Sequence, residues 1–182
     1  MLNERIKSVR WGLLLAIGTL LFGIVMGVAF GVVEDTFKDW IKASIGLYPE
    51  LHDSGSASKT WRYAQRAHFH ATGVGAFTLG MIVLLALTNL RPQLKSVTAV
   101  LIGLGGLYPL AWLSIFLYSP SMGRGPAHEA LATLVPTYAG VACLLVGIAI
   151  LMANLFLGLG GETEERAERS ADFPRRTAER LT

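Results

Sequence analysis

Four histidines are the side chains of this sequence best suited to bind a metal or a haem iron, and three of them stand at the ends of apolar segments. His68 and His70 open the uncharged run from Ala67 to Leu90, and His128 comes shortly before the run from Leu131 to Leu159. Ionisable side chains are costly in a bilayer and therefore indicate function. Because imidazole is a common ligand of haem iron, copper and zinc, these three residues form the first candidate site.

His68 and His70 cannot both point at the same spot. On a regular helix, positions i and i+2 are about 200° apart around the axis. One imidazole would face the bundle interior, and the other the lipid or a neighbouring helix. Gly73 and Gly75 follow the histidines by about one turn. They leave room for a flat group such as a porphyrin, and they equally suit close packing between helices.

The remaining ligands would come from the segment before the last apolar run. Pro126 suits the first turn of a helix, which puts His128 at the same outer depth as the other two histidines. With Glu129 beside them, three imidazoles from two helices could ligate a haem iron axially or hold copper or zinc. The fourth histidine, His52, falls in a polar loop and is expected to be solvated.

Four charged residues are expected at the same outer level, namely Glu34, Asp35, Arg66 and Arg124. Their carboxylates provide a structural alternative for the histidines, because histidines at a membrane edge also hydrogen-bond to acids or reach water. The charges would form an ion-pair cluster that holds the bundle together, or they would supply a proton path to a bound group.

The elements that must position these residues are long apolar helices. Of the 182 residues, 52% are hydrophobic and 16% are charged, whereas a soluble domain has about a quarter charged residues. Four uncharged runs each reach the roughly 20 residues that a membrane-spanning helix needs. The sequence therefore predicts an all-α integral membrane protein, a four-helix bundle with spans at about 11–33, 67–90, 97–118 and 131–159.

The distribution of basic residues predicts the topology. Lysine and arginine are concentrated before the first span, between the second and third spans, and in the tail. The positive-inside rule therefore places both termini in the cytoplasm, and the membrane would be a bacterial inner membrane. The transmembrane domain would cover 1–160, with an outer loop at 34–66 and a polar cytoplasmic tail at 161–182. The first span is too long for a cleaved signal peptide.

Within the outer loop, apolar residues recur at helical spacing between charges. They are Phe37, Trp40, Ile41 and Ile45. This pattern predicts a short amphipathic helix in the membrane interface, with Trp40 at headgroup level.

Helix packing is predicted from three glycines in the first span. Gly23, Gly27 and Gly31 stand four residues apart, a spacing that lets another helix backbone approach closely. The seam would lie within the bundle or between subunits of a homo-oligomer or larger membrane complex. Pro109 and Pro136 should kink the third and fourth spans.

The segment Ala67-His68-Phe69-His70-Ala71-Thr72-Gly73 is similar to the Ala-His-x-His-x-x-x-Gly type segment of membrane proteins related to the haem-copper oxidase catalytic subunit. It also resembles small bacterial four-helix membrane proteins, in which the first helix ends in an acidic motif and the fourth carries a histidine. Glu34-Asp35 and His128 look like those features. The resemblance implies a four-helix membrane bundle that binds haem b or copper. The glycine follows His70 by three residues rather than four, and the chain is too short for a complete oxidase site.

Two classes of function follow. The first is a haem- or metal-binding inner-membrane protein in electron transfer, sensing or a respiratory-type complex, more an oxidoreductase-associated subunit than an enzyme on its own. The second is a cofactor-free structural or accessory subunit that packs through the glycine seam. A small transporter with Arg66 and Arg124 binding an anion is a weaker third hypothesis, because no charge lies near a midplane. The net charge of +3 is spread over tails and loops and indicates no nucleic-acid partner. Nucleophile, P-loop and dinucleotide motifs are absent from the sequence, and Cys143 is a lone cysteine.

Overall fold

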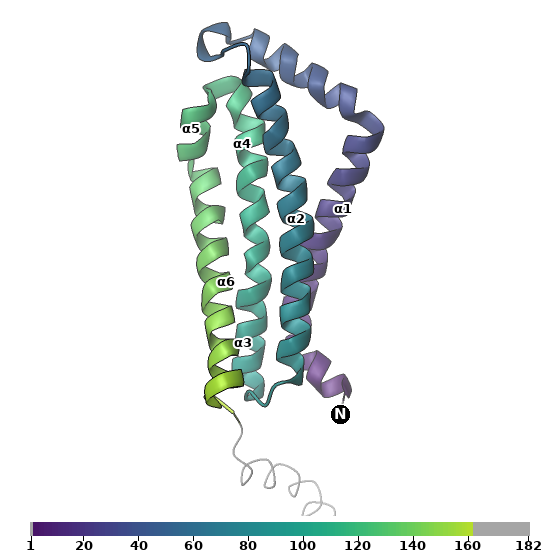
Figure 1. The fold of residues 1–182 in the computed structure, drawn as a ribbon, viewed down its shortest axis with the longest axis vertical. Helices are drawn as coiled ribbons and strands as arrows, with labels where there is room; N and C mark the ends of the chain where they lie inside the picture. Colours follow the sequence, from purple (N-terminus) through teal and green to yellow (C-terminus); the bar gives the residue numbers. More distant parts are fainter. Residues whose placement is uncertain (1, 162–182) are drawn as a thin grey trace, which may run out of the picture.

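The computed structural model describes residues 2–161, which form a bundle of long helices (Figure 1). The elements are α1 (Leu2–Gly46), η1 (Pro49–Leu51), α2 (Ser56–Leu87), α3 (Pro92–Gly103), η2 (Leu104–Leu107), α4 (Tyr108–Met122), α5 (Arg124–Glu129) and α6 (Leu131–Leu157). Within the described range, four helical stretches are long and apolar enough to cross a membrane: Arg5–Gly46, Ser56–Leu87, Pro92–Met122 and Leu131–Leu157. The prediction of an all-helical chain with four such helices is confirmed. The polar tail predicted at 161–182 lies, apart from its first residue, outside the described residues.

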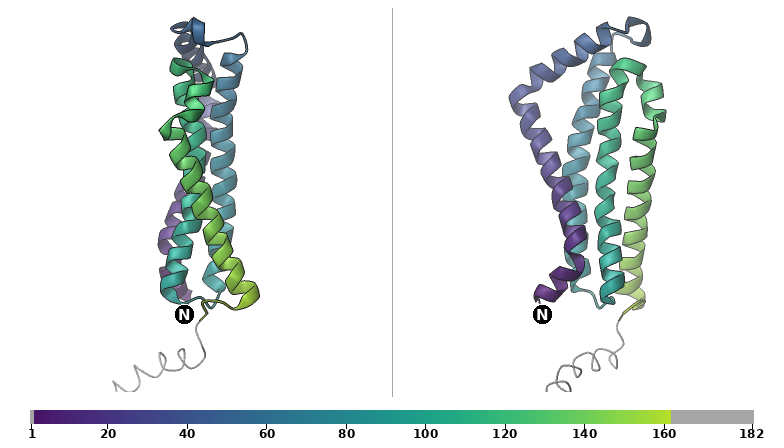
Figure 2. Two further views of the ribbon diagram at one scale, coloured as in Figure 1. Left: turned by 90° about the vertical axis from the view of Figure 1, so that its left-hand side faces the viewer. Right: turned by 180° about the vertical axis from the view of Figure 1, so that it is seen from behind.

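Helix α1 is interrupted by a bend at Val33, whose φ of −129° and ψ of 33° are not helical. The residues beyond it, 34–46, continue as a helical arm. Figures 1 and 2 show α1 leaning away from the bundle towards the bend, after which the arm turns back towards the start of α2. The residues with the amphipathic pattern are therefore the last part of α1, and a separate short helix on the outer side stays a prediction. The position of these residues at a membrane interface also stays a prediction.

The arm is anchored by its apolar face. Ile41 is only 1% exposed and belongs to a buried cluster with Tyr63, Ile115 and Phe116. The ring of Trp40 contacts that of Phe116, with centroids 5.3 Å apart, and is still 40% exposed. A second, aliphatic cluster fills the opposite end of the bundle; its buried members include Val9, Ile82, Leu85, Ile102 and Leu151.

The close approach of α1 to α2 depends on small residues in both helices. A Cβ added at Gly23 would come 2.7 Å from the backbone nitrogen of Thr72, and one added at Gly75 would come 2.7 Å from that of Leu20. Because each glycine faces the backbone of the other helix, a larger residue at either position would force the helices apart.

Proline explains the irregular third span. Pro109 has no N–H, so the carbonyl of Gly105 cannot receive the usual helical bond from four residues ahead. The N–H of Tyr108 bonds to that carbonyl instead, which produces the 3₁₀ turn η2 between α3 and α4. The kink predicted at Pro109 is thus a change of helix type.

The fourth span begins at a break that the sequence does not predict, whereas α6 itself continues through Pro136. Ala130 is extended, with φ −61° and ψ 139°, and separates α5 from α6. Thr133 donates its hydroxyl to the carbonyl of Ala127 at 2.8 Å. Pro136 leaves the carbonyl of Ala132 without its helical partner, and Ser114 of α4 donates to it at 2.8 Å. Side chains therefore replace the backbone bonds that this region lacks.

Candidate functional site

Aromatic, imidazole and guanidinium groups of α2, α4 and α5 gather near the end of the bundle that is remote from the N-terminus. The indole of Trp112 is their common neighbour. We refer to the group as the Trp112 cluster; its members are Tyr63, Arg66, His70, Tyr108, Trp112 and His128.

Two of the three predicted histidine ligands belong to the Trp112 cluster. The His70 ring lies 5.6 Å from the Trp112 ring and 5.1 Å from the Tyr108 ring, centroid to centroid. The His128 ring lies 6.4 Å from the Trp112 ring, and its Nε2 shares a hydrogen bond of 3.2 Å with the hydroxyl of Tyr63. His70 is half-buried and His128 is exposed. Imidazoles from two separate helices are therefore brought to one aromatic surface.

Arg66 covers the same indole. Its guanidinium carbon lies 4.9 Å from the Trp112 ring centroid and 5.8 Å from that of Tyr63, a cation–π arrangement. Within residues 2–161, Arg66 has no carboxylate partner and no hydrogen-bond acceptor. The indole nitrogen of Trp112 is buried and also has no hydrogen-bond partner there. The Trp112 cluster thus has more donors than acceptors.

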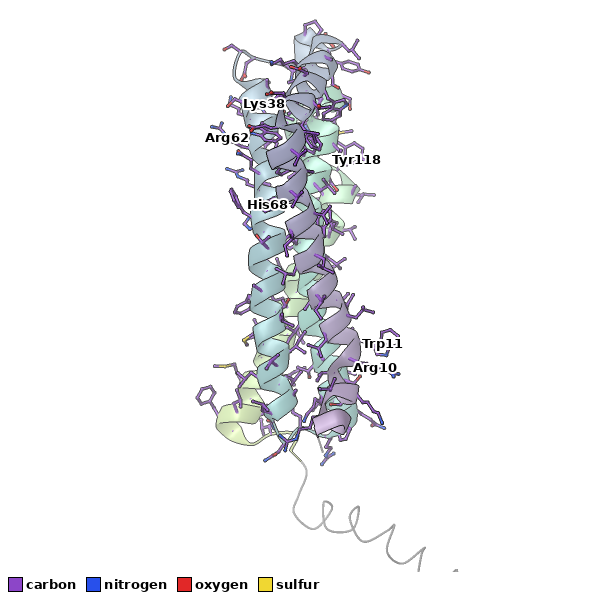
Figure 3. The ribbon with its side chains drawn as sticks, turned by 90° about the vertical axis from the view of Figure 1, so that its right-hand side faces the viewer. Arg10, Trp11, Lys38, Arg62, His68 and Tyr118 are labelled. Carbon is purple, nitrogen blue, oxygen red and sulfur yellow. The ribbon has the colours of Figure 1, made fainter. Side chains whose placement is uncertain are left out.

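The third predicted ligand, His68, faces the other side of α2. Its Nδ1 donates to the carbonyl of Gly23 in α1 at 2.7 Å. The ring also lies so close to Gly27 that a Cβ added there would come 2.6 Å from its Cε1. Figure 3 shows His68 at the side of the bundle where α1 and α2 lie next to each other. The imidazole therefore occupies the space that the glycine leaves.

The predicted three-histidine site is consequently not assembled. His68 lies against α1, whereas His70 and His128 lie against α4. Glu129 is exposed and makes no contact that would bring it to a metal. Among the residues that the structure describes, no group of three or more His, Cys, Asp or Glu side chains has an arrangement able to hold a metal ion.

The glycine seam runs between helices of the same chain at two of its three positions. Gly23 faces Thr72 and Ala71, and Gly27 faces His68, whereas nothing lies within 4 Å of a Cβ added at Gly31. The described residues therefore provide no packing partner for Gly31.

The four outer charges do not form one cluster. Glu34 pairs with Lys38 of its own helix at 2.6 Å, and Asp35 lies close enough to add to the negative charge around that lysine. Arg124 pairs with Asp53 at 3.2 Å. The charged residues thus take part in separate interactions, and Arg66 lies on the ring of Trp112.

The loop that carries His52 is held against the turn between α4 and α5, which corrects the expectation of a solvated side chain. Nε2 of His52 donates to the carbonyl of Pro120 at 2.8 Å, and its Nδ1 is buried without a partner among the described residues. Asp53 accepts bonds from Lys59 at 3.1 Å and from Arg124 at 3.2 Å. The Lys59 ammonium, followed by the hydroxyl of Ser56, holds the pKa of Asp53 below its usual value.

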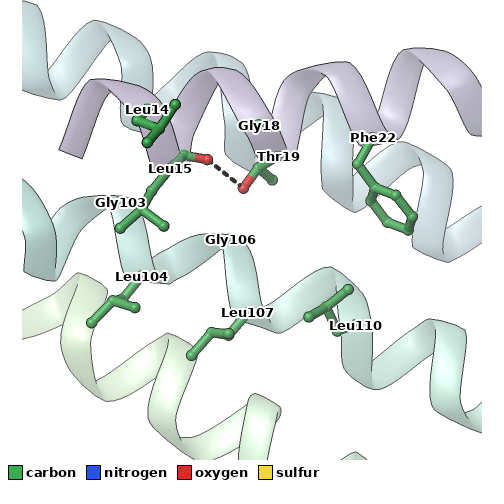
Figure 4. A pocket seen from close by; sticks show the side chains of 10 residues that line it. All are labelled: Leu14, Leu15, Gly18, Thr19, Phe22, Gly103, Leu104, Gly106, Leu107 and Leu110. Carbon is green, nitrogen blue, oxygen red and sulfur yellow. Dashed lines mark hydrogen bonds between the residues drawn. The ribbon is translucent and has the colours of Figure 1, made fainter. Parts of the chain in front are cut away.

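A groove beside the third span is apolar and lies away from the Trp112 cluster. It has a volume of about 290 Å³ and is bordered by α1, α3, η2 and α4, where Gly103 and Gly106 leave space (Figure 4). Its one hydroxyl, on Thr19, is bonded to the carbonyl of Leu15 at 2.9 Å. No histidine or charged residue lines it, so its surface suits hydrocarbon.

Sequence reasoning missed the aromatic part of the Trp112 cluster. Tyr63, Arg66 and His70 stand at positions i, i+3 and i+7, which places them on one helix face, and Tyr108 and Trp112 stand at i and i+4. These two spacings were the available signal. They gain meaning only when α2 and α4 are known to be neighbours.

Comparison with known proteins found no match to this chain among family models, curated proteins or solved structures. The arrangement of its own residues therefore carries the argument about function.

Proposed function

We propose that this chain is a haem-binding membrane protein of the electron-transfer or sensing type, working alone or within a respiratory-type complex, with His70 and His128 as its ligand pair. The observation that supports this proposal is the meeting of two imidazoles from α2 and α5 on the one indole of Trp112. We further propose a bacterial inner membrane with both termini cytoplasmic, which puts the Trp112 cluster on the outer side.

The donor set favours haem over copper or zinc. Protein copper and zinc sites use three or four side-chain ligands, and the described residues do not provide such a group. A haem iron needs at most two axial ligands from the protein, which two histidines can supply. When bound, a haem would provide one-electron redox chemistry. We leave His68 out of the ligand set because its ring is enclosed by α1.

Neighbouring residues of the chain would act on this ligand pair in opposite ways: Tyr63 would compete with iron for His128, and Tyr108 and Trp112 would hold His70 in place. Tyr63 holds Nε2 of His128 by a hydrogen bond and so competes with iron for that nitrogen. Tyr108 and Trp112 pack against the His70 ring and limit its rotation.

The experiment is an optical spectrum of the full-length protein, purified in detergent, in the oxidised and dithionite-reduced states, with metal analysis on the same sample. We expect a Soret band and sharp reduced bands that disappear in His70→Ala and in His128→Ala. His68→Ala is the matched control from the same segment and should keep the spectrum. Loss of the bands in His68→Ala with retention in His70→Ala would contradict the ligand assignment.

A cofactor-free accessory subunit is the second candidate, and the contacts of His68 favour it. One histidine of the motif already serves helix packing, together with Gly23 and Gly27. Folded protein that contains neither chromophore nor metal, and that takes up no added haemin, would make this second candidate the better one.

A further inference from the structure

We propose that Arg66 and Trp112 bind the phosphate group of a membrane phospholipid at the outer end of the bundle. The shared chemistry is that of a phosphate anion, and we commit to the phospholipid headgroup as its source. This site shares Trp112 with the proposed haem site but uses different donors, namely the guanidinium of Arg66 and the indole N–H of Trp112 rather than an imidazole.

The first argument is the unpaired charge of Arg66. In the described part of the chain, four other cations of this end have carboxylate partners: Lys38 at 2.6 Å, Lys42 at 3.2 Å, Lys59 at 3.1 Å and Arg124 at 3.2 Å. Arg62 also has no carboxylate partner there, but it lies over no aromatic ring. Arg66 instead lies over two aromatic rings, which hold its plane while leaving its N–H groups free at the edge. A guanidinium carries five N–H donors in a planar fork that matches phosphate oxygens.

The second argument is the unsatisfied indole beneath it. Nε1 of Trp112 is a donor that is buried and has no acceptor among residues 2–161. Nearly all buried polar atoms in native proteins have a hydrogen-bond partner, so such an atom indicates a group that the protein itself does not provide. The nearby hydroxyl of Tyr63 is already bonded to His128. The missing partner of the cluster is therefore an acceptor, and an anion satisfies the charge of Arg66 as well.

The third argument is the depth of Arg66 along its helix. It immediately precedes the uncharged run that begins at Ala67, within a helix of membrane-spanning length. In such a helix the last basic residue before the apolar run lies at the level of the lipid headgroups, where tryptophan is also enriched. Arg66 is exposed, so a lipid can reach its guanidinium from the side of the bundle, whereas the buried Nε1 of Trp112 becomes accessible only when the side chains that cover it shift.

The test is native mass spectrometry of the full-length protein in mild detergent, titrated with dioleoyl phosphatidylglycerol. Loss of a charged hydrogen-bond pair should weaken binding of this lipid by Arg66→Gln about 10- to 100-fold. Arg62→Gln is the matched control, because Arg62 is exposed on the same helix, has the same charge and contacts no indole in the described structure. Its effect should stay within about twofold, as for a surface charge.

Inorganic phosphate separates the two sources of the anion. Retention of the lipid in the presence of millimolar phosphate supports a headgroup site, whereas its displacement, with phosphate bound by the wild type and not by Arg66→Gln, overturns the lipid assignment in favour of free phosphate. Equal lipid retention by the wild type and both variants overturns the site altogether.

Trp112→Phe provides a second variant in case Arg66→Gln does not fold. Phenylalanine keeps one aromatic ring at this position but removes the indole N–H together with the second ring, so lipid binding should weaken by a smaller factor, about fivefold to tenfold. Unchanged binding in a folded Trp112→Phe protein overturns the role of the indole. The readout is lipid stoichiometry and needs no chromophore, so this proposal and the proposed haem can fail separately.

Discussion

The two faces of α2 treat similar side chains in opposite ways. On the face towards α1, His68 donates to a backbone carbonyl and fills the space that a glycine leaves. On the side towards α4, His70 and Arg66 each lie against the ring of Trp112, and none of these three side chains has a hydrogen-bond partner among the described residues. Polar groups that are bonded within a packed face stabilise the fold. Donors without an acceptor indicate that the face binds a further group. Two histidines separated by one residue therefore have different roles.

Replacing Gly27 by a larger residue should have the largest effect, and it tests whether the face of α2 towards α1 is tightly packed. In Gly27→Leu, the new side chain must displace the His68 ring, which lies 2.6 Å from the position of an added Cβ. We expect a loss of about 2–4 kcal/mol in stability, or failure of α1 to dock. Thermal unfolding in detergent measures the effect. Gly31→Leu is the matched control and should be nearly neutral, because no atom lies within 4 Å of its added Cβ. Equal effects of the two variants would contradict the packed face.

Removing the imidazole of His68 or of His70 compares the contribution of the two faces of α2 to stability. His68→Ala loses a buried hydrogen bond to α1 and leaves a void, so it should destabilise the protein by about 1–3 kcal/mol. His70→Ala removes only ring contacts at a half-buried position and should cost less than about 1 kcal/mol. Unfolding midpoints of the two variants, measured in the same detergent, compare these values. A larger loss for His70→Ala would reverse the assignment of the two faces.

Tyr63→Phe tests the face of α2 towards α4 by removing a single oxygen atom. The change removes the hydroxyl that bonds to Nε2 of His128 and leaves the stacked ring in place. If His128 is a haem ligand, a competitor for its nitrogen is lost, and haemin affinity should rise about threefold to tenfold. Haemin titration followed at the Soret band gives the affinity. Weaker binding in Tyr63→Phe would mean that the tyrosine orients the histidine rather than competing for it.

The smallest expected effect is on the pH dependence of stability, and it concerns Asp53 in the loop between η1 and α2. The pKa of Asp53 is lowered by Lys59 and Ser56, so its carboxylate is favoured in the folded protein. Its contribution is present above the ordinary aspartate pKa near 4 and is lost as the pH falls through the lower folded value. We expect Asp53→Asn to lower the unfolding midpoint slightly at neutral pH, where the carboxylate contributes to stability, and to leave the midpoint in acid nearly unchanged. Unfolding midpoints at about pH 3 and pH 7 test this. The same pH dependence in the variant would exclude Asp53 as its source.

The four spans were predictable from sequence because each is a long uncharged run. The placement of His68 and His70 on opposite sides of α2 likewise follows from helical geometry alone. Both features depend on residues that are close in the chain.

The features that escaped prediction depend on neighbours distant in sequence. The sequence predicts that the first span ends at Val33, where α1 bends, but it does not predict the continuation of the same helix beyond the bend. The bond from Ser114 to the carbonyl of Ala132 follows from Pro136 only once α4 is known to lie beside α6. In the same way, the stacking of Arg66 on Trp112 requires the pairing of α2 with α4. The candidate site was therefore predicted in its histidines and missed in its aromatic and cationic groups.

The break between α5 and α6 divides this end of the bundle into two helical pieces that could tilt separately in a bilayer. Ala130 is the one extended residue between two helices, and the flanking carbonyls are bonded to hydroxyls of Thr133 and Ser114 rather than to the helix ladder. A pivot there would tilt α5 without unwinding α6, whereas a continuous helix would have to tilt as a whole. Reconstitution into lipids of increasing chain length should therefore change amide hydrogen exchange around Ala130 first, while the aliphatic end of the bundle keeps its protection.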